Sequence, residues 1–188
     1  MAKVNISVDE TGVDTLGKLF RVAVFISPAE EKETLKLQAL EIEVASKKGT
    51  RSWASRSLAP RERVAYANAI AAETSFTGRL YLVDFANRLD YRAMTIEAIA
   101  RVAKTYGIID AVAIVEIDGD LSKKVVQEYA NGLRDASLFV DKVRGVRDQN
   151  EPLIRVCDAV CGWSRDIKDV ELGRAFKNAE RKGIITRL

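Results

Sequence analysis

Polar and hydrophobic side chains alternate over residues 3–12 (K-V-N-I-S-V-D-E-T-G). Side chains of a β-strand point alternately to its two faces, so the apolar positions 4, 6 and 8 share one face and the polar positions 5, 7 and 9 share the other. Asp9 therefore ends a predicted strand on its polar face, and Glu10 and Gly12 follow in a turn. A carboxylate at the point where a strand gives way to a loop is a common functional position in α/β proteins.

A hairpin is predicted next. Residues 13–17 form the expected connection, and residues 18–27 (K-L-F-R-V-A-V-F-I-S) form a second, more continuously apolar strand that should pair antiparallel with the first. Ser27 is then expected to cap a helix that has Pro28 at its first position and begins at about Ala29.

The end of that helix is ambiguous. Residues 40–44 (L-E-I-E-V) fit helical spacing and strand alternation equally well. In a strand Glu41 and Glu43 would share a face, whereas in a helix they would point nearly apart. The choice decides which of the two acids can join a functional site.

Strands and helices alternate over the rest of the chain. Predicted strands cover residues 79–85, 110–118 and 137–146, and predicted helices cover residues 60–71, 90–106, 125–133, 151–164 and 169–182. Asp90 should cap one of these helices and Gly107 should end it. This order predicts an α/β fold with a mixed sheet of about five strands and helices on both faces.

The predicted helix over residues 151–164 has a broad apolar stripe, with Arg155 and Ala159 expected to face away from it. Asp158 falls at the border of the stripe. A carboxylate at such a border is costly unless it pairs with a cation or binds a metal. Cys157 and Cys161, which lie on the stripe, are expected to be small core residues rather than a disulfide or a zinc site.

The chain contains no histidine among its 188 residues. Ser-His-Asp and Cys-His catalysis and histidine-ligated metal centres are therefore excluded. Chemistry by carboxylates, by lysine or by an oxygen-ligated metal such as Mg²⁺ or Mn²⁺ remains. The length predicts a single domain over residues 1–188, and the short apolar runs predict a cytoplasmic protein with no membrane span. A net charge of +3 favours no particular partner.

A basic segment over residues 46–57 (S-K-K-G-T-R-S-W-A-S-R-S) follows the ambiguous helix and contains no acid. Its candidate nucleic-acid contacts are Lys47, Lys48, Arg51, Trp53 and Arg56. Such a loop with an exposed aromatic ring can hold a phosphate backbone and stack on a base. The alternative is a solvated loop with Trp53 turned into the core.

Three short motifs occur in a characteristic order: D-E-T-G over residues 9–12, I-V-E-I-D ending at Asp118, and I-R-V-C-D-A-V-C-G over residues 154–162. Together they resemble a family of ribonuclease H-like domains of unknown function. The usual signature of that family is D-E-S-G, a middle E-x-K segment, a strand ending in Asp, and a final L-Q-x-A-D helix. The resemblance implies a ribonuclease H-like sheet and a divalent-metal-dependent nuclease or a relative of one.

Carried over by position, the resemblance implies that Asp9, Glu41, Asp118 and Asp158 are the catalytic ligands of Mg²⁺ or Mn²⁺. Two bound metals would activate a water and stabilise the leaving oxyanion. The chain has Glu43 where the family has lysine, so Glu43 could replace Glu41 as the ligand. Asp84 and Glu116 are alternatives to Asp118, because each also lies on a predicted strand.

The sequence therefore predicts a phosphodiesterase that acts on RNA or DNA. Additional phosphate contacts are expected from Lys123, Lys124, Arg144 and Arg147. One alternative is a non-catalytic binding or regulatory domain that uses the basic loop, or a surface for a second copy of the chain, to engage a partner. Another is a phosphotransferase with Asp as nucleophile.

Overall fold

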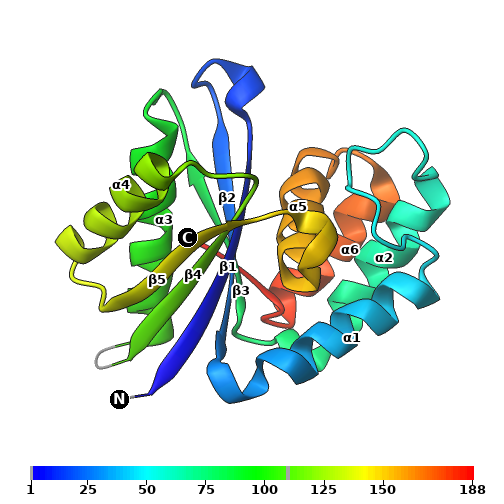
Figure 1. The fold of residues 1–188 in the computed structure, drawn as a ribbon. Helices are drawn as coiled ribbons and strands as arrows, with labels where there is room; N and C mark the ends of the chain where they lie inside the picture. The colour runs from blue at the N-terminus through cyan, green and yellow to red at the C-terminus, as the bar shows by residue number, and fades with distance from the viewer. Residues whose placement is uncertain (1, 109–110) are drawn as a thin grey trace.

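A mixed β-sheet runs through the computed structural model, which describes residues 2–108 and 111–188. In this part of the chain six strands form one sheet in the order β5-β4-β1-β2-β3-β6 (Figure 1). The strands are β1 (Lys3–Thr11), β2 (Phe20–Pro28), β3 (Leu80–Phe85), β4 (Val112–Asp118), β5 (Val140–Val146) and β6 (Ile185–Arg187). The helices are α1 (Lys32–Ala45), α2 (Pro60–Ala72), α3 (Tyr91–Tyr106), α4 (Lys123–Asp135), α5 (Pro152–Arg165) and α6 (Val170–Arg181).

Helices cover both faces of the sheet, as the sequence predicts. One hydrophobic cluster joins the sheet to α3 and α4, and a second joins the opposite face to α1, α2, α5 and α6 (Figure 1). The strand pairing is mixed, because β1 pairs antiparallel with β2 and parallel with β4. The carboxyl ends of β1 and β4 therefore meet at the same edge, and each of these two strands ends in the predicted acids.

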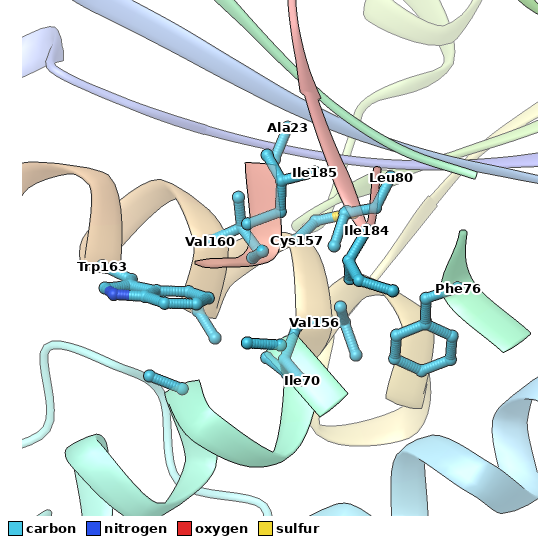
Figure 2. Close-up of a cluster of buried hydrophobic side chains, with 14 of the residues drawn as sticks. Ala23, Ile70, Phe76, Leu80, Val156, Cys157, Val160, Trp163, Ile184 and Ile185 are labelled. Carbon is cyan, nitrogen blue, oxygen red and sulfur yellow. The ribbon is translucent and has the colours of Figure 1, made fainter. Parts of the chain in front are cut away.

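Helix α5 lies against the sheet and is covered on its other side by α2 and α6. Figure 2 shows Val156, Cys157 and Val160 in the resulting core, beside Ile70 of α2. The expectation that Arg155 and Ala159 face away from the core is wrong, because both are buried. A helix enclosed by a sheet and by other helices has no free face, and a single apolar stripe in the sequence does not reveal this.

The hairpin, the α2 helix, the cap at Asp90 and the stop at Gly107 are confirmed. Residues 40–44 are helical, within α1. The expected cap at Ser27 is wrong: Ser27 lies in β2 opposite Asn5, and α1 begins only after a 3-10 turn. The predicted first residue of the fourth strand, at position 110, lies outside the described residues.

The part of the chain that the structure describes forms six strands, where the sequence predicts about five. The additional strand, β6, has only three residues, Ile185–Arg187, and pairs parallel with β3 at the sheet edge. Three residues are too few to show strand alternation, so its identity as a strand comes from the neighbouring strand. Cys157 and Cys161 are buried free thiols, as expected. None of the helices in the described residues has the length and apolar character that crossing a membrane requires.

Candidate carboxylate site

Asp9 and Asp118 lie side by side at the carboxyl edge of the sheet. The parallel register pairs Ser7 with Glu116 and Val8 with Ile117, so Asp9 and Asp118 come next on the two strands. Asp9 is also opposite Ala23, which packs in the cluster beneath α5. Side chains opposite one another across a strand pair share a face. Both acids therefore point to the α5 side of the sheet.

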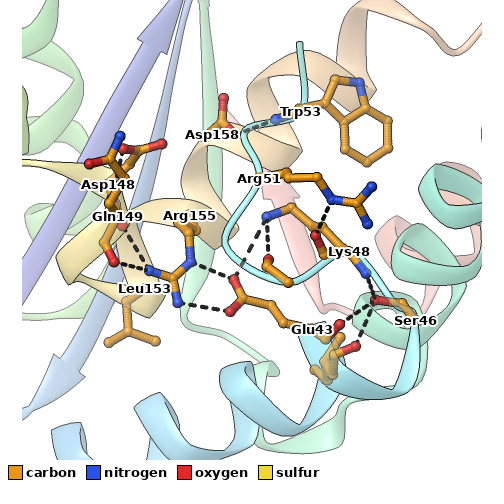
Figure 3. Close-up of polar contacts among 12 residues, drawn as sticks. Glu43, Ser46, Lys48, Arg51, Trp53, Asp148, Gln149, Leu153, Arg155 and Asp158 are labelled. Atoms are coloured by element: carbon orange, nitrogen blue, oxygen red, sulfur yellow. Dashed lines mark hydrogen bonds and ion pairs between the residues drawn. The ribbon is translucent and has the colours of Figure 1, made fainter. Parts of the chain in front are cut away.

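Asp158 reaches the same region from α5. The backbone N–H of Trp53 donates to Asp158 Oδ2 at 2.7 Å, as Figure 3 shows. One turn further along α5, the Cys161 thiol donates to the backbone carbonyl of Asp9 at 3.4 Å. These two contacts place Asp158 over the end of β1.

The charges of these acids act on one another. Burial raises the pKa of Asp9 well above its usual range, and the charges of Asp158 and Asp118 raise it further. Burial also raises the pKa of Asp158 to about 6, although the Trp53 N–H and the Lys48 ammonium lower it. Asp118 contributes to this rise as well. The structure thus brings together three of the four acids that the sequence indicates.

One further acid, Asp148, joins this group, and the sequence motifs did not indicate it. The backbone N–H of Asp148 donates to Asp118 Oδ1 at 3.0 Å, and the Asp148 charge raises the pKa values of Asp118 and Asp158. Glu10, which follows Asp9 on β1, points to the opposite face of the sheet, where it accepts a 3.3 Å bond from Thr95 Oγ1 of α3 and where burial raises its pKa. The available signal for Asp148 was its position just after a predicted strand.

A cavity of about 370 Å³ opens beside the carboxylates. Its lining includes Asp9, Glu10 and Asp158, together with the cations Arg63 and Arg165. Arg63 donates from Nε to the Trp53 carbonyl at 3.1 Å, and Arg165 donates to Thr11 Oγ1 at 3.0 Å and to Asp14. The cavity is therefore lined by both carboxylates and guanidinium groups.

A glycine lets the loop before α2 close one wall of this cavity. A Cβ on Gly162 of α5 would lie 2.2 Å from Trp53 Cδ1, far inside van der Waals contact. Without that Cβ the Trp53 ring packs on α5, and its Nε1–H donates to Asp166 Oδ2 at 2.8 Å. Trp53 thereby connects the side chains of Asp158 and Asp166 through its two N–H groups.

Glu41, the fourth acid that the resemblance implies, is exposed on α1, and no contact among the described residues joins it to this group. Helix α1 exposes Glu41 and buries Glu43, which is 1% exposed, because side chains two positions apart in a helix point in nearly opposite directions. Glu43 instead accepts two bonds from Arg155, at 2.7 and 2.8 Å, and lies 3.7 Å from Lys48 (Figure 3). It is a fully paired buried acid beside the site.

The alternatives to Asp118 are also engaged in ion pairs. Asp84 lies on β3 and bonds to Arg21 at 3.0 Å and to Arg187 at 3.1 Å. Burial alone would raise the pKa of Glu116, but hydrogen bonds from Lys32 and Arg144 outweigh it and lower the pKa. Both acids have cationic partners, in contrast to Asp9 and Asp118, whose pKa values are raised.

The predicted basic loop has both buried and exposed side chains. Trp53 is 3% exposed and Lys48 is fully buried, with its ammonium 4.8 Å from the centroid of the Tyr66 ring. Arg51 bonds to the backbone carbonyl oxygens of Lys48 and Ser57 at 2.7 and 2.6 Å. The prediction of an exposed stacking tryptophan is therefore wrong, because Trp53 packs on α5, while Lys48 and Arg51 contact α2 and the backbone of the loop itself. Exposed cations remain at two of the predicted positions, Lys47 and Arg56.

Of the other four predicted phosphate contacts, two are paired with acids and two are exposed on the far face of the sheet. Arg144 pairs with Glu116, and Arg147 pairs with Asp120. Lys123 and Lys124 are exposed in the first turn of α4, on the face of the sheet opposite α5.

The donor set suits a hard divalent cation, since every candidate ligand is a carboxylate oxygen. As placed, no three acid or thiol side chains within residues 2–108 and 111–188 converge as a ready-made chelate. The fit depends instead on electrostatics: several acids are partly desolvated and repel one another at one edge of the sheet, and a bound cation would relieve that repulsion.

No protein-family model and no curated protein matches the chain. Among solved structures, the ribonuclease H2 of Pyrococcus horikoshii OT3 superposes with a TM-score of 0.55 at 14% identity, over 95% of this chain and 76% of that one. The ribonuclease HII of Archaeoglobus fulgidus, solved in complex with PCNA, gives 0.48 at 14% identity, over 95% of this chain and 77% of that one. A mutant Bst ribonuclease HIII gives 0.46 at 12% identity, over 94% of this chain and 61% of that one.

The superposition on the Pyrococcus enzyme confirms the predicted fold class: the chain has a ribonuclease H-like fold, a six-stranded mixed sheet with helices on both faces. At 14% identity the likeness concerns the fold alone. The narrower resemblance to domains with D-E-S-G and L-Q-x-A-D motifs is not shown by these comparisons.

Proposed function

We propose that this protein is a divalent-metal-dependent phosphodiesterase that cleaves nucleic acid, with Asp9, Asp118 and Asp158 as the metal ligands. The observation that supports this most strongly is the electrostatic coupling of these acids on one face of the sheet edge. Carboxylates that only stabilise a fold have cationic partners, as Glu43 and Asp84 do. Asp9 is buried among other acids instead, an arrangement that favours binding of a cation.

The ligand carboxylates are oriented by backbone groups. The Trp53 N–H holds Asp158, and the Asp148 N–H holds Asp118, each through one carboxylate oxygen. In this proposal, the second oxygen of each side chain would bind the cation. Asp148 adds negative charge nearby and is a further candidate ligand. When bound, Mg²⁺ or Mn²⁺ would supply an activated water and stabilisation of the leaving oxygen.

The substrate would lie in the cavity beside the acids. Arg63 and Arg165 line this cavity and offer guanidinium donors to a phosphodiester, which needs two or more donors on one phosphate. The shared fold with a protein named as a ribonuclease makes RNA the first substrate to test. The cavity is lined by backbone-anchored side chains, and this rigidity is what positioning of a phosphate requires.

The test is cleavage of labelled RNA, DNA and RNA–DNA hybrid, with Mn²⁺, with Mg²⁺ and with EDTA. We expect metal-dependent cleavage of at least one substrate, and a loss of at least 10²-fold in Asp9→Asn, because an oxyanion-stabilising ligand group contributes on that order. The matched control is Asp141→Asn, which also replaces one aspartate by asparagine and changes the net charge equally, but at an exposed position of β5.

Two results would contradict the proposal. One is the lack of cleavage of all three substrates with either metal, which would favour a binding or regulatory domain. The other is cleavage by Asp9→Asn at the rate of the Asp141→Asn control, since the coupled acids would then have no part in the chemistry.

A further inference from the structure

A second concave surface lies between α2 and α6, which pack side by side on the same face of the sheet as α5 (Figure 1). This groove has a volume of about 400 Å³. It is lined by Asn68, Arg174, Ala175, Lys177, Asn178 and Arg181. Three of these six side chains are cations, two are carboxamides, and none is an acid. We call this surface the α2–α6 groove.

The three cations form one stripe along α6. At about 100° per residue, Arg174, Lys177 and Arg181 fall within about 60° of one another around the helix axis. The opposite side of the helix carries Leu172 and Phe176, which are buried. Packing of that apolar side fixes the direction of the stripe, and all three cations are exposed.

These cations are not neutralised by neighbouring acids. The ion pairs found within residues 2–108 and 111–188 include Glu180 with Arg187, but none includes Arg174, Lys177 or Arg181. Arg181 donates instead to the amide oxygen of Asn178 at 3.0 Å, within the groove. Three unpaired cations in a row create a local positive potential that attracts a polyanion.

The length of the stripe suits a nucleic-acid strand. Seven residues of helix, from position 174 to 181, rise about 10 Å, which is about three nucleotides at 3.4 Å each. The carboxamides of Asn68 and Asn178 can add hydrogen bonds to phosphate or sugar oxygens. The lining has no aromatic residue, a residue type enriched at the centre of protein–protein interfaces, and its one apolar residue is Ala175.

The α2–α6 groove and the cavity beside the carboxylates share helix α2 in their linings. Helix α2 provides Arg63 to the cavity and Asn68, more than one turn further on, to the groove. On the other side, Asp166 lines the cavity just before α6 begins at Val170. A strand that leaves the cavity along α2 and α6 would meet the cations in sequence.

We propose that the α2–α6 groove binds the phosphate backbone of the nucleic acid on which the carboxylate site acts. This inference rests on the proposed function for its ligand class. The groove adds to the exposed cations Lys47 and Arg56 of the loop over residues 46–57. The other candidate contacts of that loop are engaged within the fold, because Lys48 and Trp53 are buried and Arg51 bonds to backbone carbonyl oxygens. The groove would contribute affinity without sequence preference, because cations and amides on a helix surface contact phosphates rather than base edges.

The test is the salt dependence of binding, measured by fluorescence anisotropy with a labelled single-stranded RNA in EDTA, so that no cleavage occurs. The groove variant combines Arg174→Gln, Lys177→Gln and Arg181→Gln. The control combines Lys3→Gln, Lys104→Gln and Lys142→Gln, which removes the same charge from three exposed and scattered positions. Circular dichroism melting checks that both variants fold.

We expect the slope of log K against log salt to be smaller by about 2 in the groove variant than in the control, because each lost phosphate contact on a single strand removes about 0.7. Equal slopes in the two variants would overturn the inference and leave the groove to an acidic protein partner. Failure of the wild-type chain to bind RNA would overturn it as well.

A cleavage assay with the same proteins separates the two proposals. If the slopes differ as expected but no metal or substrate gives cleavage, the phosphodiesterase fails and the groove stands as a nucleic-acid contact. If RNA is cleaved but the slopes are equal, the groove fails and the carboxylate site stands.

Discussion

Asp158→Asn should stabilise the metal-free protein at neutral and higher pH. Burial and neighbouring acids raise the pKa of Asp158 to about 6, whereas an aspartate in an unfolded chain has a pKa of about 3.9. The folded state therefore binds this proton more tightly than the unfolded state does. The free energy of unfolding must fall as pH rises from about 4 to about 6, and the loss persists above that range.

The size of the effect follows from the two pKa values. A change of one in pKa corresponds to about 1.4 kcal/mol, so ionised Asp158 costs about 3 kcal/mol at pH 8. The asparagine side chain has no charge to desolvate and keeps an oxygen that can accept the Trp53 N–H bond. The variant should thus exceed the wild type by up to about 3 kcal/mol at pH 8 and match it near pH 4.

Urea denaturation in EDTA, at intervals from pH 4 to pH 8, measures this difference directly. Asp141→Asn serves as the control, since it removes an exposed acid from a strand at the sheet edge. Mn²⁺ at 100 times its Kd should add about 2.7 kcal/mol to the wild type at pH 8 and much less to Asp158→Asn. A variant that is less stable than the wild type at pH 8, or a difference that does not depend on pH, would refute the reasoning.

Three further substitutions test neighbouring contacts. Arg155→Met should cost about 3–5 kcal/mol in urea denaturation, because it removes both hydrogen bonds to the buried Glu43 carboxylate and leaves it only Lys48 at 3.7 Å. Adding Glu43→Gln should recover part of this loss, since Lys48 then loses its own acid partner, and no recovery at all would mean that packing, not charge, dominates. Gly162→Ala places a Cβ 2.2 Å from Trp53 Cδ1, so the substitution should both shift the tryptophan fluorescence spectrum and reduce the rate of cleavage. A shifted spectrum with a normal rate of cleavage would show that the position of Trp53 does not matter for the activity. Arg165→Gln should raise KM for an oligonucleotide about tenfold with a smaller change in kcat, and an unchanged KM would exclude Arg165 as a phosphate contact.

The strands that carry Asp9 and Asp118 could be predicted from sequence because their pattern is local. Alternation with period two identifies the first strand, a short continuous apolar run identifies the second, and an acid follows the apolar residues of each. Their adjacency follows once β1 and β4 pair in parallel, which the alternating order of strands and helices favours. Asp158 could be singled out because the apolar stripe of its helix is also a local pattern, and this residue lies at the border of the stripe.

The choice between Glu41 and Glu43 could not be made in this way. Amphipathic spacing does not say which side of α1 meets α5, and only Arg155 on α5 explains why Glu43 is the buried acid. Arg155 in turn appears polar in the sequence and is 1% exposed in the fold. Buried ion pairs between distant segments depend on tertiary contacts that a local pattern does not contain.

The inward orientation of the Trp53 ring could not be predicted either, because it also depends on tertiary contacts. Gly162 gives room for its ring, and Asp158 and Asp166 accept its two N–H groups, but the three acceptor and packing positions are more than a hundred residues away. Asp148 was missed because it joins the group through a backbone bond to Asp118 rather than through a recognisable motif.

The most direct test of the carboxylate site is a calorimetric titration of the wild-type chain with Mn²⁺ at pH 8, alongside Asp9→Asn and Asp141→Asn. The account predicts saturable binding by the wild type and by Asp141→Asn, and a loss of at least tenfold in affinity in Asp9→Asn, because a metal-binding group of acids loses a ligand and a charge. Equal Mn²⁺ affinity in all three proteins would contradict it.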